Sequence, residues 1–191
     1  FGIEVGEPRI NSSLLVEREN KVVKQMTGGV KTLLSGRQVE IFKGKAKLVS
    51  AHRVAVALND GSATEITADH IILATGAEAG MPPGFKLDGE RVITSKEALD
   101  LTSQPRRIAV LGGGVVGCEF ACFFAAIGSQ VTLVEMLPRL VPAEDDEIAQ
   151  TLEREMKKQK IALHLGAKVE NLATASNGTV TLTLAGGKTV E

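Results

Sequence analysis

The spacing of hydrophobic and polar residues changes along the chain, and each change predicts a different kind of element. In residues 12–35 apolar side chains recur every three or four positions, which predicts an amphipathic helix with Ser12 or Ser13 as its N-cap. In residues 38–76 the period falls to two, and the Asn-Asp-Gly sequence at 59–61 supplies a turn between alternating runs. This part of the chain is therefore expected to be a helix followed by an antiparallel β-meander.

The pattern changes again after a segment at 81–92 that is rich in proline, glycine and charged residues. Such a composition is typical of a connection, so we expect two domains, spanning residues 1–80 and 81–191. Early in the second domain, Thr94 and Glu97 have the spacing of a capping box, which predicts the start of a short helix.

Strand-like and helix-like patterns then alternate in the second domain. The predicted order is a strand at 107–111, a helix at 115–127, a strand at 130–135 and a helix at 144–159, followed by strands at 160–169 and 178–190. This order predicts an α/β fold, with a Rossmann-like parallel unit followed by antiparallel strands.

Composition narrows the possible classes of function. The 191 residues are 43% hydrophobic and 24% charged and carry a formal net charge of −1, so they offer no basic surface for nucleic acid. No apolar stretch approaches the ~20 residues that cross a bilayer, and the first ten residues lack the pattern of a signal peptide. We therefore expect neither a nucleic-acid nor a membrane partner, and a cytoplasmic location.

The two cysteines and three histidines do not form a recognisable metal or redox motif. Cys118 and Cys122 are four apart in a predicted helix, which places both thiols on one face, and His52, His70 and His164 are scattered. A disulfide across a single helical turn would be strained, and no histidine lies beside the cysteines to complete a zinc site. The cysteines are expected to be small packing residues, and no metal site is expected.

Residues 106–120, RRIAVLGGGVVGCEF, place three successive glycines between a predicted strand and a predicted helix. Gly112, Gly114 and Gly117 match the G-x-G-x-x-G spacing: the first permits a tight turn, the second lets a pyrophosphate approach the backbone, and the third lets the helix pack on the strand. The N-terminus of the helix then offers N–H groups and a partial positive charge to the phosphates.

A carboxylate at the end of the next strand strengthens this interpretation. Glu135 follows the glycines by about 20 residues, where an acidic side chain can accept hydrogen bonds from the ribose hydroxyls of adenosine. The same carboxylate would repel the 2′-phosphate of NADP. No arginine follows immediately, and Arg139 is expected to be a surface residue. The site is therefore predicted to prefer NAD.

A second motif lies upstream, where HIILATGA at residues 70–77 is predicted to be a buried strand that ends in Ala-Thr-Gly. Together with the glycine motif downstream, it resembles the flavin- and NAD-dependent disulfide reductases, whose flavin domain has such a segment just before the NAD domain. Similar segments run along nearly the whole chain, and they are most similar to the dihydrolipoyl dehydrogenases of this family. Examples are NKVVKQMTGGVKTLL, VITSKEALDL and GSQVTLVEMLPRLVPAEDDEI.

The resemblance implies an FAD/NAD(P)-binding fold in which residues 1–80 are part of the FAD domain and residues 81–191 are the NAD domain. It also implies a role for each residue that matches a family motif. The NAD pyrophosphate would lie against Gly112, Gly113, Gly114, Val115, Val116, Gly117 and Glu119, the ribose against Glu135 and the adenine against Val169, whereas FAD would be contacted by Ala46, Thr75, Gly76 and Ala77.

Two of these positions carry further expectations from the resemblance. Glu119 matches a family glutamate that pairs with a lysine near the redox cysteines, and that lysine is not in this sequence. Val115 stands where many relatives have an aromatic residue that shields the nicotinamide pocket.

The resemblance also implies that the chain is the middle part of a longer enzyme. The family's flavin-binding glycine motif, its Cys-x4-Cys redox pair and its His–Glu acid–base pair have no counterpart in the 191 residues, and the last strand of the NAD domain is missing. We therefore expect no catalytic residue in this sequence. The chain on its own is expected neither to retain FAD nor to turn over.

In such enzymes electrons pass from a dithiol to an active-site disulfide, through FAD, and on to NAD as hydride. The resemblance implies oxidation of dihydrolipoyl groups by a homodimeric parent enzyme, located in the mitochondrial matrix if it is eukaryotic. Its partners would be the lipoyl-bearing acyltransferase subunits of 2-oxoacid dehydrogenase complexes or a glycine cleavage protein.

Two alternatives remain open at this stage. The first is another disulfide reductase of the mercuric or glutathione reductase type, although Glu135 argues against the glutathione enzymes because they favour NADP. The second is a non-catalytic NAD-binding module, which would normally begin at the strand that precedes the glycines.

Overall fold

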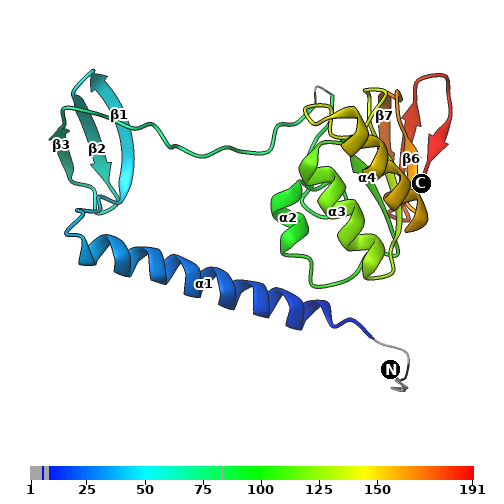
Figure 1. Ribbon diagram of the computed structural model, residues 1–191, viewed down its shortest axis with the longest axis horizontal. Helices are drawn as coiled ribbons and strands as arrows, with labels where there is room; N and C mark the ends of the chain where they lie inside the picture. Colours follow the sequence, from blue (N-terminus) through cyan, green and yellow to red (C-terminus); the bar gives the residue numbers. More distant parts are fainter. Residues whose placement is uncertain (1–5, 7–8, 83) are drawn as a thin grey trace. The chain divides into compact units, whose positions relative to one another are not determined.

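The structure is a computed structural model that describes residue 6, residues 9–82 and residues 84–191 (Figure 1). The chain divides into two units, each described by itself. Residues Glu19–Glu78 form one, here called the meander unit. The described residues up to Arg18 and those from Ala79 to Glu191 form the other, here called the α/β unit.

A long helix precedes the meander, as the apolar spacing predicts. Helix α1 spans Ser12–Gly36, but its cap differs from the expected serines, because the Leu14 N–H donates to the side-chain oxygen Oδ1 of Asn11 at 3.1 Å. Asparagine caps a helix as well as serine does, so the start of the helix shifts by one residue. No residue of α1 is buried.

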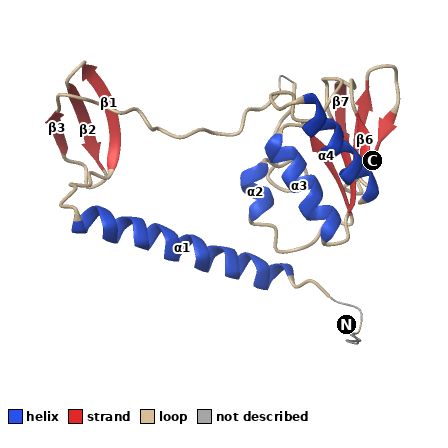
Figure 2. Cartoon of the chain, viewed as in Figure 1, coloured by secondary structure: helices blue, strands red, loops and turns tan. Residues whose placement is uncertain are grey.

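The meander unit contains a three-stranded antiparallel sheet in the order β1-β2-β3, with β1 at Gly44–Ser50, β2 at Arg53–Leu58 and β3 at Ala63–Thr67 (Figure 2). The predicted turn at 59–61 joins β2 to β3, and Gly61 adopts the left-handed φ of +88° that this turn requires. The meander is thus confirmed, although its first strand begins six residues later than the predicted start at residue 38.

The strand predicted at 70–77 is wrong. Residues 68–80 contain no strand, and Ile72 and Leu73 in the middle of the apolar run are 90% and 71% exposed. A strand exists only where a neighbour receives its backbone hydrogen bonds, and none of the described strands pairs with this segment.

The α/β unit is built around a parallel sheet in the order β4-β5-β6. Its strands are β4 (Arg107–Leu111), β5 (Gln130–Val134) and β6 (Ala162–His164), and its helices are α2 (Ser95–Leu99), α3 (Val115–Ala126) and α4 (Asp146–Lys158). The predicted capping box is confirmed, because Glu97 accepts from the Thr94 N–H and the Thr94 side chain caps α2. Helix α4 begins two residues later than predicted.

A second sheet follows the parallel one. It is antiparallel, in the order β7-β8-β9, with β7 at Val169–Thr174, β8 at Val180–Leu184 and β9 at Thr189–Val190. The single strand predicted at 160–169 is wrong, because Gly166 takes a left-handed φ of +65° and turns the chain out of the parallel sheet. This turn separates β6 from β7.

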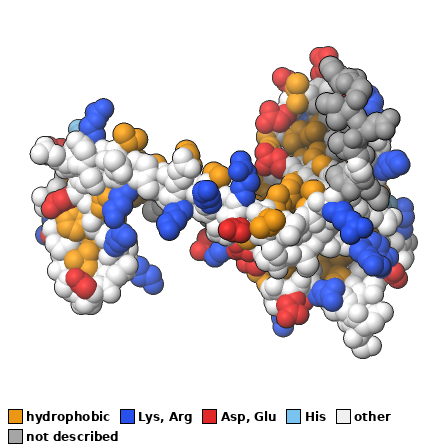
Figure 3. Space-filling view, turned by 90° about the horizontal axis from the view of Figure 1, so that it is seen from below, with side chains coloured by type: hydrophobic (Ala, Val, Ile, Leu, Met, Phe, Trp, Pro, Cys, Tyr) orange, Lys and Arg blue, Asp and Glu red, His pale blue; other side chains and the backbone are white. Residues whose placement is uncertain are grey.

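Side chains of β5 point alternately to the two faces of the parallel sheet and pack against the helices on one face and the antiparallel sheet on the other. Val131 and Leu133 point to one face and join Phe124 of α3 and Met156 of α4 in the main core, whereas Val134 belongs to a second core with residues of β8 and β9. The parallel sheet therefore lies between the helices and the antiparallel sheet. Apolar side chains also reach the surface in both units (Figure 3).

Candidate dinucleotide-binding site

The glycine turn connects the end of β4 to the start of α3. Gly112 has a φ of +111°, and its N–H donates to the carbonyl oxygen of Val134 at 2.9 Å, which ties the turn to the end of β5. An L-residue rarely adopts this φ, so glycine at this position follows from the backbone geometry.

The other three glycines meet different surroundings. A Cβ on Gly117 would collide with the carbonyl oxygen of Gly112, and a Cβ on Gly113 would lie 3.0 Å from Glu135 and 2.9 Å from Leu140. A Cβ on Gly114, by contrast, would meet nothing within 4 Å. Gly113 and Gly117 are therefore explained by packing within the protein, whereas the space beside Gly114 is open.

Gly114 is also the N-cap of α3. It makes no side-chain cap hydrogen bond, and the first turn of the helix contains no acidic residue. The first N–H groups of any helix lack partners inside the helix, and its N-terminus carries a partial positive charge. An open, uncapped helix start beside a glycine turn is suited to a phosphate group.

Glu135 lies directly after β5, beside this turn. Its side chain is buried, and it accepts hydrogen bonds from the Gly113 N–H at 2.5 Å and from the Leu137 N–H at 2.7 Å. These two bonds, absent from the sequence-based prediction, orient the carboxylate and compensate for part of its burial. Each carboxylate oxygen has a second lone pair, so both remain able to accept from a ribose hydroxyl.

The loop that follows Glu135 packs against the glycine turn. Leu140 is fully buried next to Gly113, and the Val141 N–H donates to the Gly113 carbonyl oxygen at 2.7 Å. The sequence-based prediction did not identify either residue. Their residue types do not distinguish them from the other apolar residues of the loop, Met136 and Leu137.

The remaining residues predicted for NAD binding are only partly brought together. Val115, Val116 and Glu119 lie in the first turns of α3, next to Gly114, and are exposed. Val169 begins β7, where it is partly buried against the second core. The structure therefore places the α3 residues and Glu135 around one turn, whereas the proposed adenine contact of Val169 remains a prediction.

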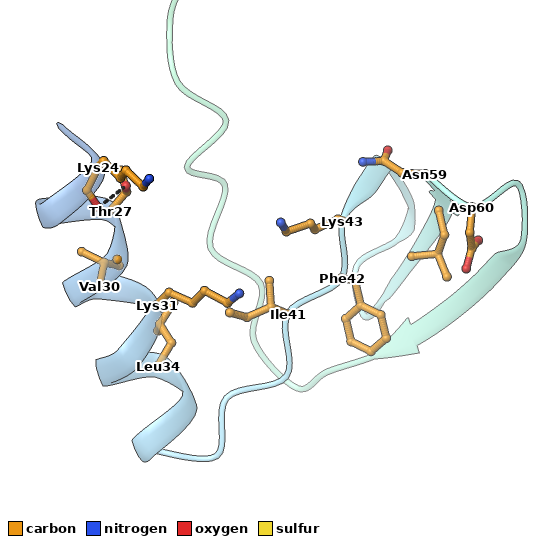
Figure 4. A pocket seen from close by; sticks show the side chains of 12 residues that line it. Lys24, Thr27, Val30, Lys31, Leu34, Ile41, Phe42, Lys43, Asn59 and Asp60 are labelled. Carbon is orange, nitrogen blue, oxygen red and sulfur yellow. Dashed lines mark hydrogen bonds between the residues drawn. The ribbon is translucent and has the colours of Figure 1, made fainter. Parts of the chain in front are cut away.

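The residues predicted to contact FAD all lie in the meander unit. Ala46 is paired with Val56 in the sheet, and Thr75, Gly76 and Ala77 are exposed in the segment after β3. The hollow found in this unit, of about 1010 Å³, lies elsewhere, between α1 and the residues around Phe42 and Asn59 (Figure 4). The described part of the chain thus does not assemble these four residues into an enclosed site.

Both cysteines are protected as neutral thiols, in agreement with the predicted packing role. Burial, with smaller contributions from Cys122 and Glu135, raises the pKa of Cys118 to about 11, and burial also raises the pKa of Cys122. The Cys118 thiol donates to the Gly113 carbonyl oxygen at 3.5 Å. A thiolate is the reactive form of cysteine, so neither side chain is prepared for redox chemistry.

We expect Cys118 and Cys122 in the folded protein to react with a thiol reagent at pH 8 far more slowly than in the urea-unfolded protein. In the native state burial raises the pKa of Cys118 to about 11 and also raises the pKa of Cys122, whereas an unfolded thiol loses its proton near ~8.5. Stability should therefore fall as the pH rises through this window, because the native state binds more protons. Mass mapping of labelled peptides measures the rates, and rapid native labelling of Cys118 would contradict the assignment.

The described residues offer neither a metal site nor a membrane span. Among the described residues, no group of three or more histidine, cysteine or acidic side chains is placed to hold a metal ion. None of the helices in the described ranges is long and apolar enough to cross a membrane.

The strand, glycine turn and helix, with the layers around them, are those of the FAD/NAD(P)-binding fold, which confirms the predicted fold class. The sequence profile of the pyridine nucleotide-disulphide oxidoreductases matches residues 3–191, and the chain belongs to this family.

Comparison with individual relatives leads to the same family. The chain is 40% identical over 178 residues to a dihydrolipoyl dehydrogenase of Chlorobaculum tepidum, covering 93% of this chain and 38% of the relative. It is 38% identical over 193 residues to dihydrolipoyl dehydrogenase 3 of Pseudomonas putida, covering 100% of this chain and 41% of the relative. The chain thus spans about two fifths of the length of these relatives.

Solved structures agree with the sequence comparison. LpdA from Mycobacterium tuberculosis superimposes with a TM-score of 0.86 at 27% identity, over 97% of this chain and 41% of that one. The HOCl-induced flavoprotein disulfide reductase RclA of Escherichia coli superimposes with a TM-score of 0.74 at 27% identity, over 92% of this chain and 39% of that one.

Proposed function

We propose that this chain is the NAD-binding part, with a portion of the flavin domain, of an oxidoreductase that oxidises dihydrolipoyl groups and reduces NAD. The relatives named dihydrolipoyl dehydrogenase support the substrate class. The observation that carries the nucleotide assignment is the Glu135 carboxylate, which is hydrogen-bonded to the glycine turn beside an open helix N-terminus.

The residues of the α/β unit fit a dinucleotide. Gly114 and the start of α3 would hold the pyrophosphate, because the space there is open and the helix start offers N–H donors. Glu135 would accept the hydrogen bonds of the adenosine ribose, with its orientation already set by Gly113 and Leu137. Bound NAD would supply the hydride acceptor of the reaction.

The contribution of this chain to such a reaction is binding and orientation. The buried carboxylate and the glycine turn fix the adenosine half of the nucleotide, which limits where its reactive half can lie. Burial raises the pKa of Cys118 and of Cys122, which disfavours the thiolate, so we assign neither cysteine a role in electron transfer. Acid–base and disulfide chemistry would belong to other residues of the full-length protein.

The assignments that concern the whole protein rest on its family. We propose residues 1–80 as part of the FAD domain and residues 81–191 as the NAD domain, although the described residues do not assemble an FAD cradle. We also propose a homodimeric enzyme that acts on the lipoyl-bearing subunits of 2-oxoacid dehydrogenase complexes, or on a glycine cleavage protein. Its location would be the cytoplasm, or the mitochondrial matrix in a eukaryote.

The experiment is a steady-state assay of the full-length protein with dihydrolipoamide, in which NAD and NADP are compared as acceptors. We expect Glu135→Ala to lower kcat/KM for NAD. The loss should correspond to about 1.5–3 kcal/mol of transition-state stabilisation, the cost of losing hydrogen bonds to a charged group. NADP should suffer much less, because the repulsion of its 2′-phosphate is removed at the same time. The preference for NAD over NADP should therefore fall.

Glu170→Ala provides the matched control, because this glutamate is exposed in β7 and its removal changes the charge by the same amount. Equal losses for NAD and NADP in Glu135→Ala would show that the carboxylate only supports the turn. A wild-type protein that does not oxidise dihydrolipoamide would contradict the proposed substrate.

A further inference from the structure

Arg139 holds the loop that joins β5 to α4. Its guanidinium forms an ion pair with Asp146, the first residue of α4, and its Nη2 group donates to the carbonyl oxygens of Pro142 at 2.6 Å and Glu144 at 3.1 Å. One side chain thus connects two carbonyl groups of the loop to the first residue of α4. The Arg139 side chain is 34% exposed, so it lies partly at the surface, and the sequence did not indicate its contacts within the loop.

The backbone inside this loop is strained at Val141. This residue has a φ of +37°, in the left-handed region that a β-branched side chain rarely adopts. Val141 is buried, its N–H donates to the Gly113 carbonyl oxygen at 2.7 Å, and its own carbonyl oxygen accepts from the Glu144 N–H at 2.9 Å. The strained residue is therefore the one that contacts the glycine turn.

A backbone conformation of this kind persists only where the surroundings over-determine it. The turn from Val141 to Glu144 is closed on one side by its own hydrogen bond and on the other by Arg139, which binds the carbonyl oxygens of Pro142 and Glu144. Leu140, the residue before Val141, is fully buried beside Gly113 and fixes the start of this turn. Arg139 is the charged group that fastens this arrangement.

We propose that Arg139 is a positioning residue for the dinucleotide: it holds Val141 in its strained conformation and thereby fixes Gly113 in the glycine turn. Gly113 is the shared point, because its N–H donates to Glu135 while its carbonyl oxygen accepts from Val141. The position of Gly113 therefore determines the orientation of the Glu135 carboxylate toward the ribose and the conformation of the glycine turn that would hold the pyrophosphate. The inference rests on the proposed NAD binding.

The contacts also predict which part of the arrangement matters most. Asp146 is 82% exposed, and ion pairs at such exposure contribute little. The hydrogen bonds to the two carbonyl oxygens are the stronger part of the interaction, since a guanidinium donates in a fixed planar geometry. Removing Asp146 should therefore have a smaller effect than removing Arg139.

The test is calorimetric titration of NAD into the full-length protein and its variants. We expect Arg139→Gln to weaken NAD binding by about tenfold, the lower end of what losing hydrogen bonds from a charged group costs. Asp146→Asn should weaken it by about threefold or less. Arg154→Gln is the matched control, because Arg154 is exposed on α4 and its guanidinium donates to Thr151 in its own helix.

A second substitution separates positioning from general stability. Glycine adopts a left-handed φ without strain, so Val141→Gly should recover most of the affinity lost in Arg139→Gln, although it removes a buried side chain. Val141→Ala removes a buried side chain too but keeps the strain, and it should recover nothing. A merely structural role for Arg139 would predict that both double variants bind more weakly still.

The proposal is overturned if folded Arg139→Gln binds NAD as the wild type does, or if Val141→Gly gives no recovery beyond that of Val141→Ala. Should Arg139→Gln fail to fold, Arg139→Lys replaces it, and wild-type affinity in that variant would overturn the role of the planar guanidinium.

If the wild type itself does not bind NAD, the proposed function fails. If Glu135→Ala weakens binding and Arg139→Gln does not, only the present inference fails.

Discussion

The Gly114→Val variant is expected to fold and to bind NAD at least about 100-fold more weakly than the wild type. The open space beside Gly114 accommodates the new side chain, so the protein itself has no steric reason to unfold. The valine would occupy the position proposed for the pyrophosphate and would displace it from the helix N–H groups. Losing two hydrogen bonds to a charged group costs about 3–6 kcal/mol, which exceeds a factor of 100 in affinity.

Calorimetric titration measures the loss, and circular dichroism checks that the helical content is retained. Gly114→Ala adds a graded comparison, because its single methyl group intrudes less and should weaken binding less. Wild-type affinity in a folded Gly114→Val variant would mean that the glycine serves only the turn, and the pyrophosphate would then have to lie elsewhere.

Most of the α/β unit follows from local sequence patterns. The strand β4 and the helix α3 begin at the predicted residues, because an apolar strand-like run, a glycine turn and a second, longer apolar run succeed one another without ambiguity. The relation between Gly112 and Glu135 is also predictable, since parallel strands place their carboxyl ends at one edge of the sheet. The candidate site could therefore be located before its geometry was known.

The details of that site could not be predicted in the same way. Nothing in the residue type of Val141 indicates a left-handed φ, since valine disfavours it. Arg139 was expected at the surface because a charged residue in a polar loop usually lies there. Its three contacts depend on how the chain closes back on α4, which a local pattern does not contain.

The meander unit shows the limit of periodicity more plainly. The run at 70–77 has the apolar character of a buried strand, yet Ile72 is 90% exposed and no described strand pairs with it. The hydrophobicity of a segment predicts that it will be buried where another strand or helix packs against it. It does not show whether such a neighbouring element is present. The exposed apolar side chains of α1 follow the same rule, because the described part of the unit buries only Val56 among its large hydrophobic residues.

Gly117→Ala is expected to lower the free energy of unfolding of the α/β unit by about 3 kcal/mol, at the upper end of overpacking costs. The new Cβ would collide with the carbonyl oxygen of Gly112 and would lie 3.1 Å from its carbonyl carbon and 3.4 Å from Cγ1 of Val110. Backbone atoms cannot move aside as the end of a flexible side chain can. The helix would have to separate from β4, and the glycine turn would open with it.

Urea denaturation of the full-length protein, followed by circular dichroism, measures this effect, with Gly114→Ala as the matched control. That substitution adds the same methyl group three residues earlier, where the backbone is extended (φ −72°, ψ 179°) and the space is open. It should cost no more than about 1 kcal/mol, through a poorer N-cap. Equal stabilities of the two variants would contradict the close approach of α3 to the turn, because only that approach distinguishes the two positions.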